Sequence, residues 1–124
     1  MVSSGDDMPR DVFISYSTKD KKLVEQICRA LEGAGITCWM AHRDIPKTKV
    51  WAEEIPTAIE QCRLFLLIFT ANANASKFVF KEVTYADDID KPILNFRVED
   101  FAPAKKYKLY LSTVQALDAT TPPI

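Results

Sequence analysis

The feature that most restricts the fold of this chain is the stretch Leu64–Phe69, in which every residue is apolar. A strand with one face in water alternates apolar and polar side chains, whereas a strand that is covered on both faces does not alternate. Strands of this second kind occur in parallel sheets that carry helices on both faces. The stretch therefore predicts a buried parallel strand at residues 64–69 within an α/β domain.

A strand, a helix and a second strand are predicted before this stretch. Residues 11–15 favour a strand, and apolar residues then recur at helical spacing through residues 23–34. Gly35 is well placed to end that helix. Residues 36–40 are rich in side chains that favour strands, so they form the second predicted strand.

Two connecting segments are predicted in the same region. Residues 16–20 form the turn that leaves the first strand, and Ser17 with Asp20 has the spacing of a capping box for the following helix. Residues 41–50 show neither the helical nor the strand period, which predicts a long surface loop. Long ordered loops in compact domains often carry function.

A second helix is predicted at residues 51–62, and it contains a proline. The ring of Pro56 would clash with the carbonyl of Ala52, so the helix either starts at Pro56 or is kinked there. After the apolar stretch, residues 70–75 are predicted to form a loop. A third helix follows from Ser76.

The remaining elements complete an alternating pattern of strands and helices. A strand is predicted at residues 93–97, a short helix within residues 102–111, and a last strand at residues 113–117. Alternation of this kind favours a doubly wound α/β domain, here a five-stranded parallel sheet with helices on both faces. Ligands of such sheets bind beyond the carboxyl ends of the strands, where the winding direction reverses.

The predicted domain covers residues 11–118. Residues 1–10 are polar and show no period, so they read as a loose tail. Residues 119–124 carry two prolines and two threonines, which indicates the start of a linker to a further domain. No apolar run approaches the length that crosses a bilayer, and no secretory signal is evident in the tail, so a cytoplasmic protein is expected.

Charge and cysteine content argue against two classes of ligand. The chain has 16 basic and 17 acidic residues, and without a basic excess nucleic-acid binding has little electrostatic basis. Cys28, Cys38 and Cys62 show no CxxC spacing and fall at apolar positions, which predicts buried free thiols. With His42 as the single histidine, no metal site is expected.

Phe78 and Glu82 are the candidate functional pair. Residues four apart on a helix share a face, so the ring and the carboxylate would lie side by side. An aromatic surface beside an acid suits a cationic aromatic group, and the acid suits positive charge that develops on a sugar. The alternative interpretation is a solvated glutamate beside a packed phenylalanine.

Three segments, in order, resemble the signature blocks of Toll/interleukin receptor (TIR) domains of the bacterial kind. They are residues 11–17, the segment from Arg43-Asp44-Ile45-Pro46 to Trp51-Ala52-Glu53-Glu54-Ile55, and Ser76 with Phe78 and Glu82. The resemblance spans residues 11–118. It implies a flavodoxin-like fold, which agrees with the pattern of strands and helices above.

The resemblance also implies a function. Some TIR domains cleave the nicotinamide–ribose bond of NAD+, and bacterial members often act as effectors in antiphage defence. The resemblance makes Glu82 the catalytic residue, with NAD+ as the substrate and no cofactor. Phe78, where the family commonly has tryptophan, would cover the nicotinamide, while Tyr16, Ser17 and Trp51 would line the same cleft.

Arg43, Asp44 and Pro46 are expected to act in assembly. The matching loop of the family contacts a neighbouring TIR domain, and head-to-tail association would complete the active site between protomers. The alternative is a local salt bridge between Arg43 and Asp44 that only shapes the loop. Lys47 and Thr48 stand where the family usually has Pro-Gly. The expected partners are NAD+, other TIR domains and a sensor domain after residue 124.

Three functions are alternatives to NAD+ cleavage. The first is a non-catalytic adaptor module, which the family also contains. A phosphoacceptor receiver domain lacks the residues it needs, because Phe69-Thr70-Ala71 follows the third strand in place of an aspartate. A flavin-binding domain is compatible with the hydroxyl-rich residues 15–18, which could cradle a phosphate.

Overall fold

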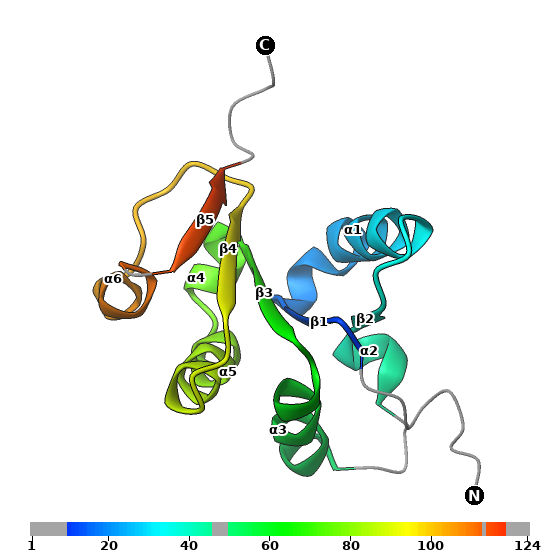
Figure 1. Ribbon diagram of the computed structural model, residues 1–124. Coiled ribbons are helices and arrows are strands. Elements are labelled where there is room, and N and C mark those ends of the chain that lie inside the picture. Colours follow the sequence, from blue (N-terminus) through cyan, green and yellow to red (C-terminus); the bar gives the residue numbers. More distant parts are fainter. Residues whose placement is uncertain (1–9, 46–49, 113, 119–124) are drawn as a thin grey trace, which may run out of the picture.

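The computed structural model describes residues 10–45, 50–112 and 114–118 (Figure 1). It contains one parallel sheet in the order β2-β1-β3-β4-β5. This is the strand order of doubly wound sheets of the flavodoxin type. The strands are β1 (Val12–Ser15), β2 (Cys38–Trp39), β3 (Leu64–Phe69), β4 (Ile93–Arg97) and β5 (Gln115–Asp118).

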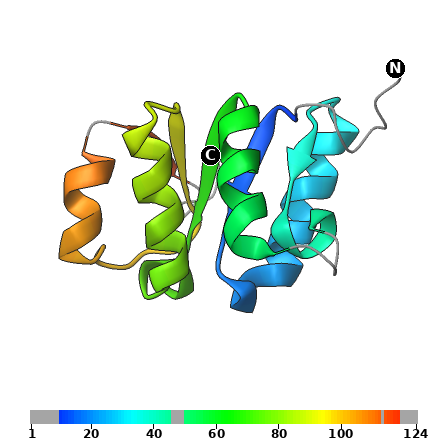
Figure 2. The same cartoon turned by 90° about the horizontal axis from the view of Figure 1, so that it is seen from below.

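Helices cover both faces of this sheet. Helix α1 packs on one face, and α3, α5 and α6 lie side by side on the other (Figure 2). The α/β fold with a parallel sheet is therefore confirmed. The helices are η2 (Thr18–Asp20, a 3₁₀ turn), α1 (Lys21–Gly33), α2 (Ala41–Asp44), α3 (Trp51–Gln61), α4 (Ala71–Asn74), α5 (Lys77–Asp88) and α6 (Lys105–Leu111).

Strand β3 divides the core into two clusters. Phe65, Leu67 and Phe69 pack with α3, α5 and α6, whereas Leu66 and Ile68 pack with α1. All five side chains are buried. Two-sided burial explains why the strand has no polar residue, and the prediction made from this stretch is confirmed.

The two segments predicted as loops each contain one turn of helix. Residues 41–50 begin with α2, and residues 70–75 contain α4, so both predictions were wrong in part. A single helical turn is too short for apolar residues to reveal a period. Side chains hold both turns, because Asp44 accepts a hydrogen bond from the Met40 amide (2.8 Å) and Thr70 caps α4.

Helix α3 runs from Trp51 to Gln61 and contains Pro56, which excludes the alternative of a helix that starts at Pro56. Pro56 has no amide hydrogen, and the carbonyl of Ala52 therefore loses its helical partner. Ser17 begins η2 instead of α1, because its side chain accepts a hydrogen bond from the Lys19 amide. The predicted capping box at the start of α1 is therefore wrong.

Several predictions lie outside the described residues. These are the tail at residues 1–9, Pro46, Lys47 and Thr48 in the predicted assembly loop, and the linker at residues 119–124.

The second strand, predicted at residues 36–40, is shorter and covers only Cys38–Trp39.

Candidate functional site

Glu82 lies on α5, beside the carboxyl end of β1. Ser76 starts α5, since its hydroxyl accepts a hydrogen bond from the Val79 amide (3.1 Å). Val79 and Val83 are buried in the core. Glu82 lies next to this apolar stripe and is only 7% exposed, whereas Phe78, one turn earlier, is 48% exposed. The helix therefore carries the carboxyl group inside and the aromatic ring at the surface.

One hydrogen bond holds the buried carboxyl group. The Ser15 hydroxyl donates to Glu82 Oε1 over 2.7 Å. Burial raises the pKa of Glu82 to about 8, and the bond from Ser15 opposes this shift only in part. At neutral pH the carboxyl group of the free chain is therefore mostly protonated, and it sits at the end of β1, next to the point where the sheet reverses direction.

Four rings form a continuous row from the end of β1 to α5, which we call the aromatic row: Tyr16, His42, Trp51 and Phe78. Neighbouring ring centres are 5.6 Å apart for Tyr16 and His42, 5.3 Å for His42 and Trp51, and 6.3 Å for Trp51 and Phe78. Tyr16 is buried, while Trp51 and Phe78 are exposed. Burial raises the pKa of Tyr16, and the charge of an ionised Glu82 raises it further.

His42 is the member of the row that sequence reasoning missed. Its ring Nδ1 lies 2.5 Å from the Tyr16 hydroxyl, and its backbone amide donates to the same hydroxyl over 3.2 Å. Burial, followed by the charge of Lys21, lowers the pKa of His42. The neutral ring therefore accepts a hydrogen bond from the Tyr16 hydroxyl at Nδ1, and burial raises the pKa of Tyr16 to about 12. The signal in the sequence was a single histidine just after the second predicted strand.

Among the predicted site residues, Ser17 forms a hydrogen bond with the backbone. It is buried, and its hydroxyl accepts a hydrogen bond from the Lys19 amide (3.2 Å). Ser15 is engaged with Glu82. Three of the hydroxyls at residues 15–18, those of Ser15, Tyr16 and Ser17, are therefore engaged in hydrogen bonds within the chain, which gives the flavin alternative no support.

A second polar cluster joins the ends of β1 and β3, and sequence reasoning did not predict it. Asp20 accepts hydrogen bonds from the Thr70 hydroxyl (2.5 Å) and from the side-chain amide of Asn72 (3.0 Å). The Thr70 hydroxyl also accepts from the Ala73 amide. The cluster ties together the two segments that leave the sheet where its winding direction reverses.

Arg43 and Asp44 form a network around β2. Arg43 Nη2 lies 3.1 Å from Asp44 Oδ2, and it donates to the Cys38 carbonyl over 2.6 Å. Arg43 also pairs with Glu32 (2.9 Å), and Arg10 pairs with Asp44 (3.1 Å). The local salt bridge predicted for this pair is therefore present. This network of bonds holds α2 against β2.

Metal-binding groups of the usual kind are absent from residues 10–45, 50–112 and 114–118, where no three His, Cys, Asp or Glu side chains converge. The three cysteines are free and buried, as predicted. Within the same residues, no helix is long and apolar enough to cross a bilayer.

A family model described as "TIR domain" matches residues 12–123. No curated protein matches the sequence.

Several solved structures share the fold. The TIR domain of the Toll-related receptor TRR-2 from Hydra magnipapillata has a TM-score of 0.73 and 21% identity, over 86% of this chain and 83% of that one. The CMP N-glycosidase BcmB from Clostridium botulinum has a TM-score of 0.64 and 18% identity, over 88% and 87% of the two chains. A TIR-STING receptor from C. gigas has a TM-score of 0.68 and 18% identity, over 94% of this chain and 37% of that one.

Proposed function

Because this chain belongs to the TIR domain family, we propose that it is an NAD+ glycohydrolase that cleaves the nicotinamide–ribose bond, with Glu82 as the catalytic residue. The observation that carries the proposal is the buried carboxyl group of Glu82, held by Ser15 at the carboxyl edge of the sheet beside the aromatic row. A fold shared with a protein named as a CMP N-glycosidase adds support, because that enzyme also acts on an N-glycosidic bond.

The reaction needs only one carboxyl group. Nicotinamide is cationic in NAD+, so the electron pair of the breaking bond neutralises it and it leaves without being protonated. The ribose carbon becomes cationic in the transition state, and an ionised Glu82 stabilises that charge. Water then adds to this carbon and releases a proton, which gives ADP-ribose. Attack by a group of the same molecule would give a cyclic isomer.

Glu82 must lose its proton to act in this way. The carboxyl group of the free chain is mostly neutral at pH 7, since burial raises its pKa to about 8. The positive charge of a bound nicotinamide ring favours the ionised form and so lowers that pKa. Substrate binding therefore produces the charged carboxylate that the transition state requires.

The aromatic row supplies the binding surface for the nicotinamide ring. Phe78 and Trp51 are exposed, and their rings stand at 67° to each other, so a flat cation can rest against one or both. Tyr16 forms the buried end of the row. We assign Tyr16 and Ser17 to the wall of the same binding site.

Assembly would complete the site. We place Arg43, Asp44 and Pro46 at a contact between TIR domains of a homo-oligomer or filament, and we take the chain to be the effector part of a bacterial antiphage receptor. A sensor domain after residue 124 would trigger this assembly. The burial of Glu82 supports the arrangement, because a carboxyl group that is 7% exposed is closed to a substrate in the isolated chain.

The test is release of nicotinamide from NAD+ by protein that has been induced to assemble. The parent is expected to release nicotinamide, and Glu82→Gln is expected to lose at least about a hundredfold in turnover. Glu53→Gln, which changes an exposed glutamate on α3, is the control. Equal turnover by Glu82→Gln and the parent would show that Glu82 takes no part in the reaction.

A non-catalytic TIR–TIR interaction module is the second candidate. The same burial of Glu82 favours it, because a closed carboxyl group can be a structural one. This candidate predicts that changes at Asp44 or Pro46 abolish partner binding. It also predicts that no assembly condition yields nicotinamide.

A further inference from the structure

His42 lies between Tyr16 and Trp51 in the aromatic row, and its two ring nitrogens have different surroundings. Nδ1 lies 2.5 Å from the hydroxyl of Tyr16, which is buried. Nε2 diverges from Nδ1 across the ring and therefore points away from that hydroxyl. His42 is exposed, and within the described residues Nε2 takes part in no hydrogen bond. This nitrogen is therefore open to a ligand.

Hydrogen bonding at the Tyr16 hydroxyl determines which nitrogen of His42 carries the hydrogen. The backbone amide of His42 donates to this hydroxyl over 3.2 Å, so the hydroxyl oxygen already accepts one bond. If Nδ1 also donated to it, the Tyr16 hydrogen would have no acceptor among the described residues, and a buried donor without an acceptor is unfavourable. Nδ1 therefore accepts, and the hydrogen of the neutral ring is on Nε2.

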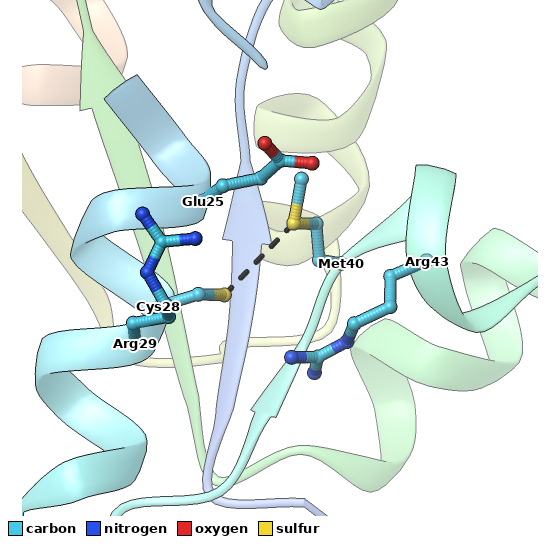
Figure 3. A pocket seen from close by; sticks show the side chains of 5 residues that line it. All are labelled: Glu25, Cys28, Arg29, Met40 and Arg43. Atoms are coloured by element: carbon cyan, nitrogen blue, oxygen red, sulfur yellow. Dashed lines mark hydrogen bonds between the residues drawn. The ribbon is translucent and has the colours of Figure 1, made fainter. Parts of the chain in front are cut away.

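Two charged side chains of α1 act on the His42 ring. Partial burial lowers the pKa of His42, the charge of Lys21 lowers it further, and the charge of Glu25 opposes both. Glu25 forms no hydrogen bond with Nε2 in the part of the chain that the structure describes, and it lies on the wall of a pocket of about 240 Å³ (Figure 3). The other residues that line this pocket are Cys28, Arg29, Met40 and Arg43. The ring is therefore neutral, and no carboxylate of α1 occupies its Nε2–H group.

Building on the proposed cleavage of NAD+, we propose that His42 determines substrate specificity, because its Nε2–H group donates a hydrogen bond to the carboxamide oxygen of the nicotinamide ring. Trp51 is exposed, and its ring centre lies 5.3 Å from that of His42. A ring that binds against Trp51 therefore lies next to His42. The aromatic surface attracts any flat cation, whereas the N–H donor favours a cation that carries a hydrogen-bond acceptor.

Tyr16 is the positioning residue in this arrangement. Its hydroxyl is bonded to the ring and to the backbone of His42, so it fixes both the hydrogen on Nε2 and the orientation of the ring. A donor that is already oriented loses little freedom when a ligand binds. Tyr16 therefore acts on the carboxamide through His42.

The first test measures which ring nitrogen carries the hydrogen. His42 is the single histidine of the chain, so long-range 1H–15N NMR of the purified, untagged protein reports on this ring alone. At about pH 8, where the ring is neutral, the parent is expected to carry the hydrogen on Nε2. Tyr16→Phe should raise the share of the form with the hydrogen on Nδ1. A parent with the hydrogen on Nδ1 would overturn the proposal.

The second test compares two cations by NMR titration of the purified chain. 1-Methylnicotinamide has the cationic ring and the carboxamide of NAD+, whereas 1-methylpyridinium has the same ring without the carboxamide. The parent is expected to bind 1-methylnicotinamide about two- to tenfold more tightly, which is the contribution of one hydrogen bond, and its Nε2 resonance should shift on binding. No preference for 1-methylnicotinamide in the parent would overturn the proposal.

His42→Asn is the variant that isolates the donor. Its side-chain oxygen stands near the position of Nδ1 and can accept from Tyr16, but it has no group at the position of Nε2. His42→Asn should therefore bind the two cations with equal affinity, and a preference as strong as that of the parent would overturn the proposal. Glu25→Gln is the control and should retain the preference. Loss of the preference in Glu25→Gln would show that the carboxamide contact comes from Glu25 and would also overturn the proposal.

These measurements separate the role of His42 from the proposed enzyme activity. Neither cation carries a ribose, so no bond has to be cleaved. Preference for 1-methylnicotinamide in a chain that cleaves no NAD+ under any assembly condition would contradict the proposed activity alone. Cleavage of NAD+ by a parent without that preference would contradict the role of His42 alone.

Discussion

The hydroxyl of Ser15, the last residue of β1, donates a 2.7 Å hydrogen bond to Glu82, which is 67 positions later on α5. This single bond joins the end of a central strand to a helix on the face that α3 and α6 also cover. It holds the carboxyl group at the end of β1 and offsets part of the rise in pKa that burial causes. Two of the predictions that follow depend on it directly.

Glu82 should make the stability of the chain fall as the pH rises. The pKa is raised from 4.5 in the unfolded chain to about 8 in the folded one, so the folded state holds the extra proton between these values. The contribution of Glu82 to the free energy of unfolding is complete below pH 4.5 and declines up to about pH 8, by on the order of 4 kcal/mol.

Chemical unfolding between pH 4 and 9 measures this decline. Glu82→Gln should flatten it, because an amide does not ionise. Glu53→Gln changes an exposed glutamate and should retain the slope of the parent. A parent whose stability rises between pH 5 and 8 would contradict the assignment.

Ser15→Ala should raise the pKa of Glu82 further. The variant removes the hydrogen bond that favours the ionised carboxylate. It should shift the pH dependence of kcat/KM for NAD+ cleavage to higher pH and cost about 1–3 kcal/mol of stability. Ser112→Ala, which removes an exposed hydroxyl at the end of α6, is the control and should change neither quantity. An unchanged pH profile in Ser15→Ala would argue against the role of the bond.

Phe78 should act in substrate binding more than in stability. It is 48% exposed, so Phe78→Ala should leave the melting temperature nearly unchanged and raise the KM for NAD+ by about tenfold. Phe78→Trp keeps an aromatic surface and should retain activity. Leu109→Ala, at an exposed apolar residue of α6, should have no effect on KM. If Phe78→Ala has the KM of the parent, the ring does not contact the substrate.

Tyr16 and His42 should be energetically coupled. The Tyr16 hydroxyl is bonded to both the ring and the backbone of His42. His42→Ala removes the ring acceptor of a mostly buried hydroxyl and should cost about 1–3 kcal/mol. Tyr16→Phe should remove much of that cost, so the double-mutant cycle should give a coupling above about 0.5 kcal/mol. Strict additivity of the two changes would contradict the coupling.

Asp44 should stabilise the fold, and any effect of Asp44 on assembly should depend on that stability. Its side chain is 11% exposed and is bonded to Arg10, Arg43 and the Met40 amide. Asp44→Ala should cost about 1–3 kcal/mol, because it leaves the amide of the buried residue Met40 and the partly buried Arg10 without the carboxylate. Glu32→Ala breaks only an exposed pair with Arg43 and should cost less than about 1 kcal/mol.

Thermal unfolding of both variants, measured beside their assembly, separates the two roles. An Asp44→Ala protein that is fully stable but does not assemble would show that Asp44 contacts a partner. A protein that loses both properties would show that assembly fails because α2 is no longer held on β2.

Local sequence was sufficient to predict much of this fold. The unbroken apolar stretch at residues 64–69 indicates burial on both faces, and helical spacing after Ser76 predicts the buried stripe of α5. Spacing also placed Phe78 and Glu82 on one helix. These predictions succeed because the periods of strands and helices are properties of the backbone itself.

Only the tertiary structure decided how Glu82 and its surroundings meet. The bond from Ser15, the row that His42 completes, and the bonds from Thr70 and Asn72 to Asp20 all join residues that are far apart in the sequence. The short helices α2 and α4 have no period of their own, and contacts with distant residues, Arg10 with Asp44 and Asn72 with Asp20, help to hold them in place. The pKa of Glu82 is raised by burial, which is a property of the packed chain and cannot be read from neighbouring residues.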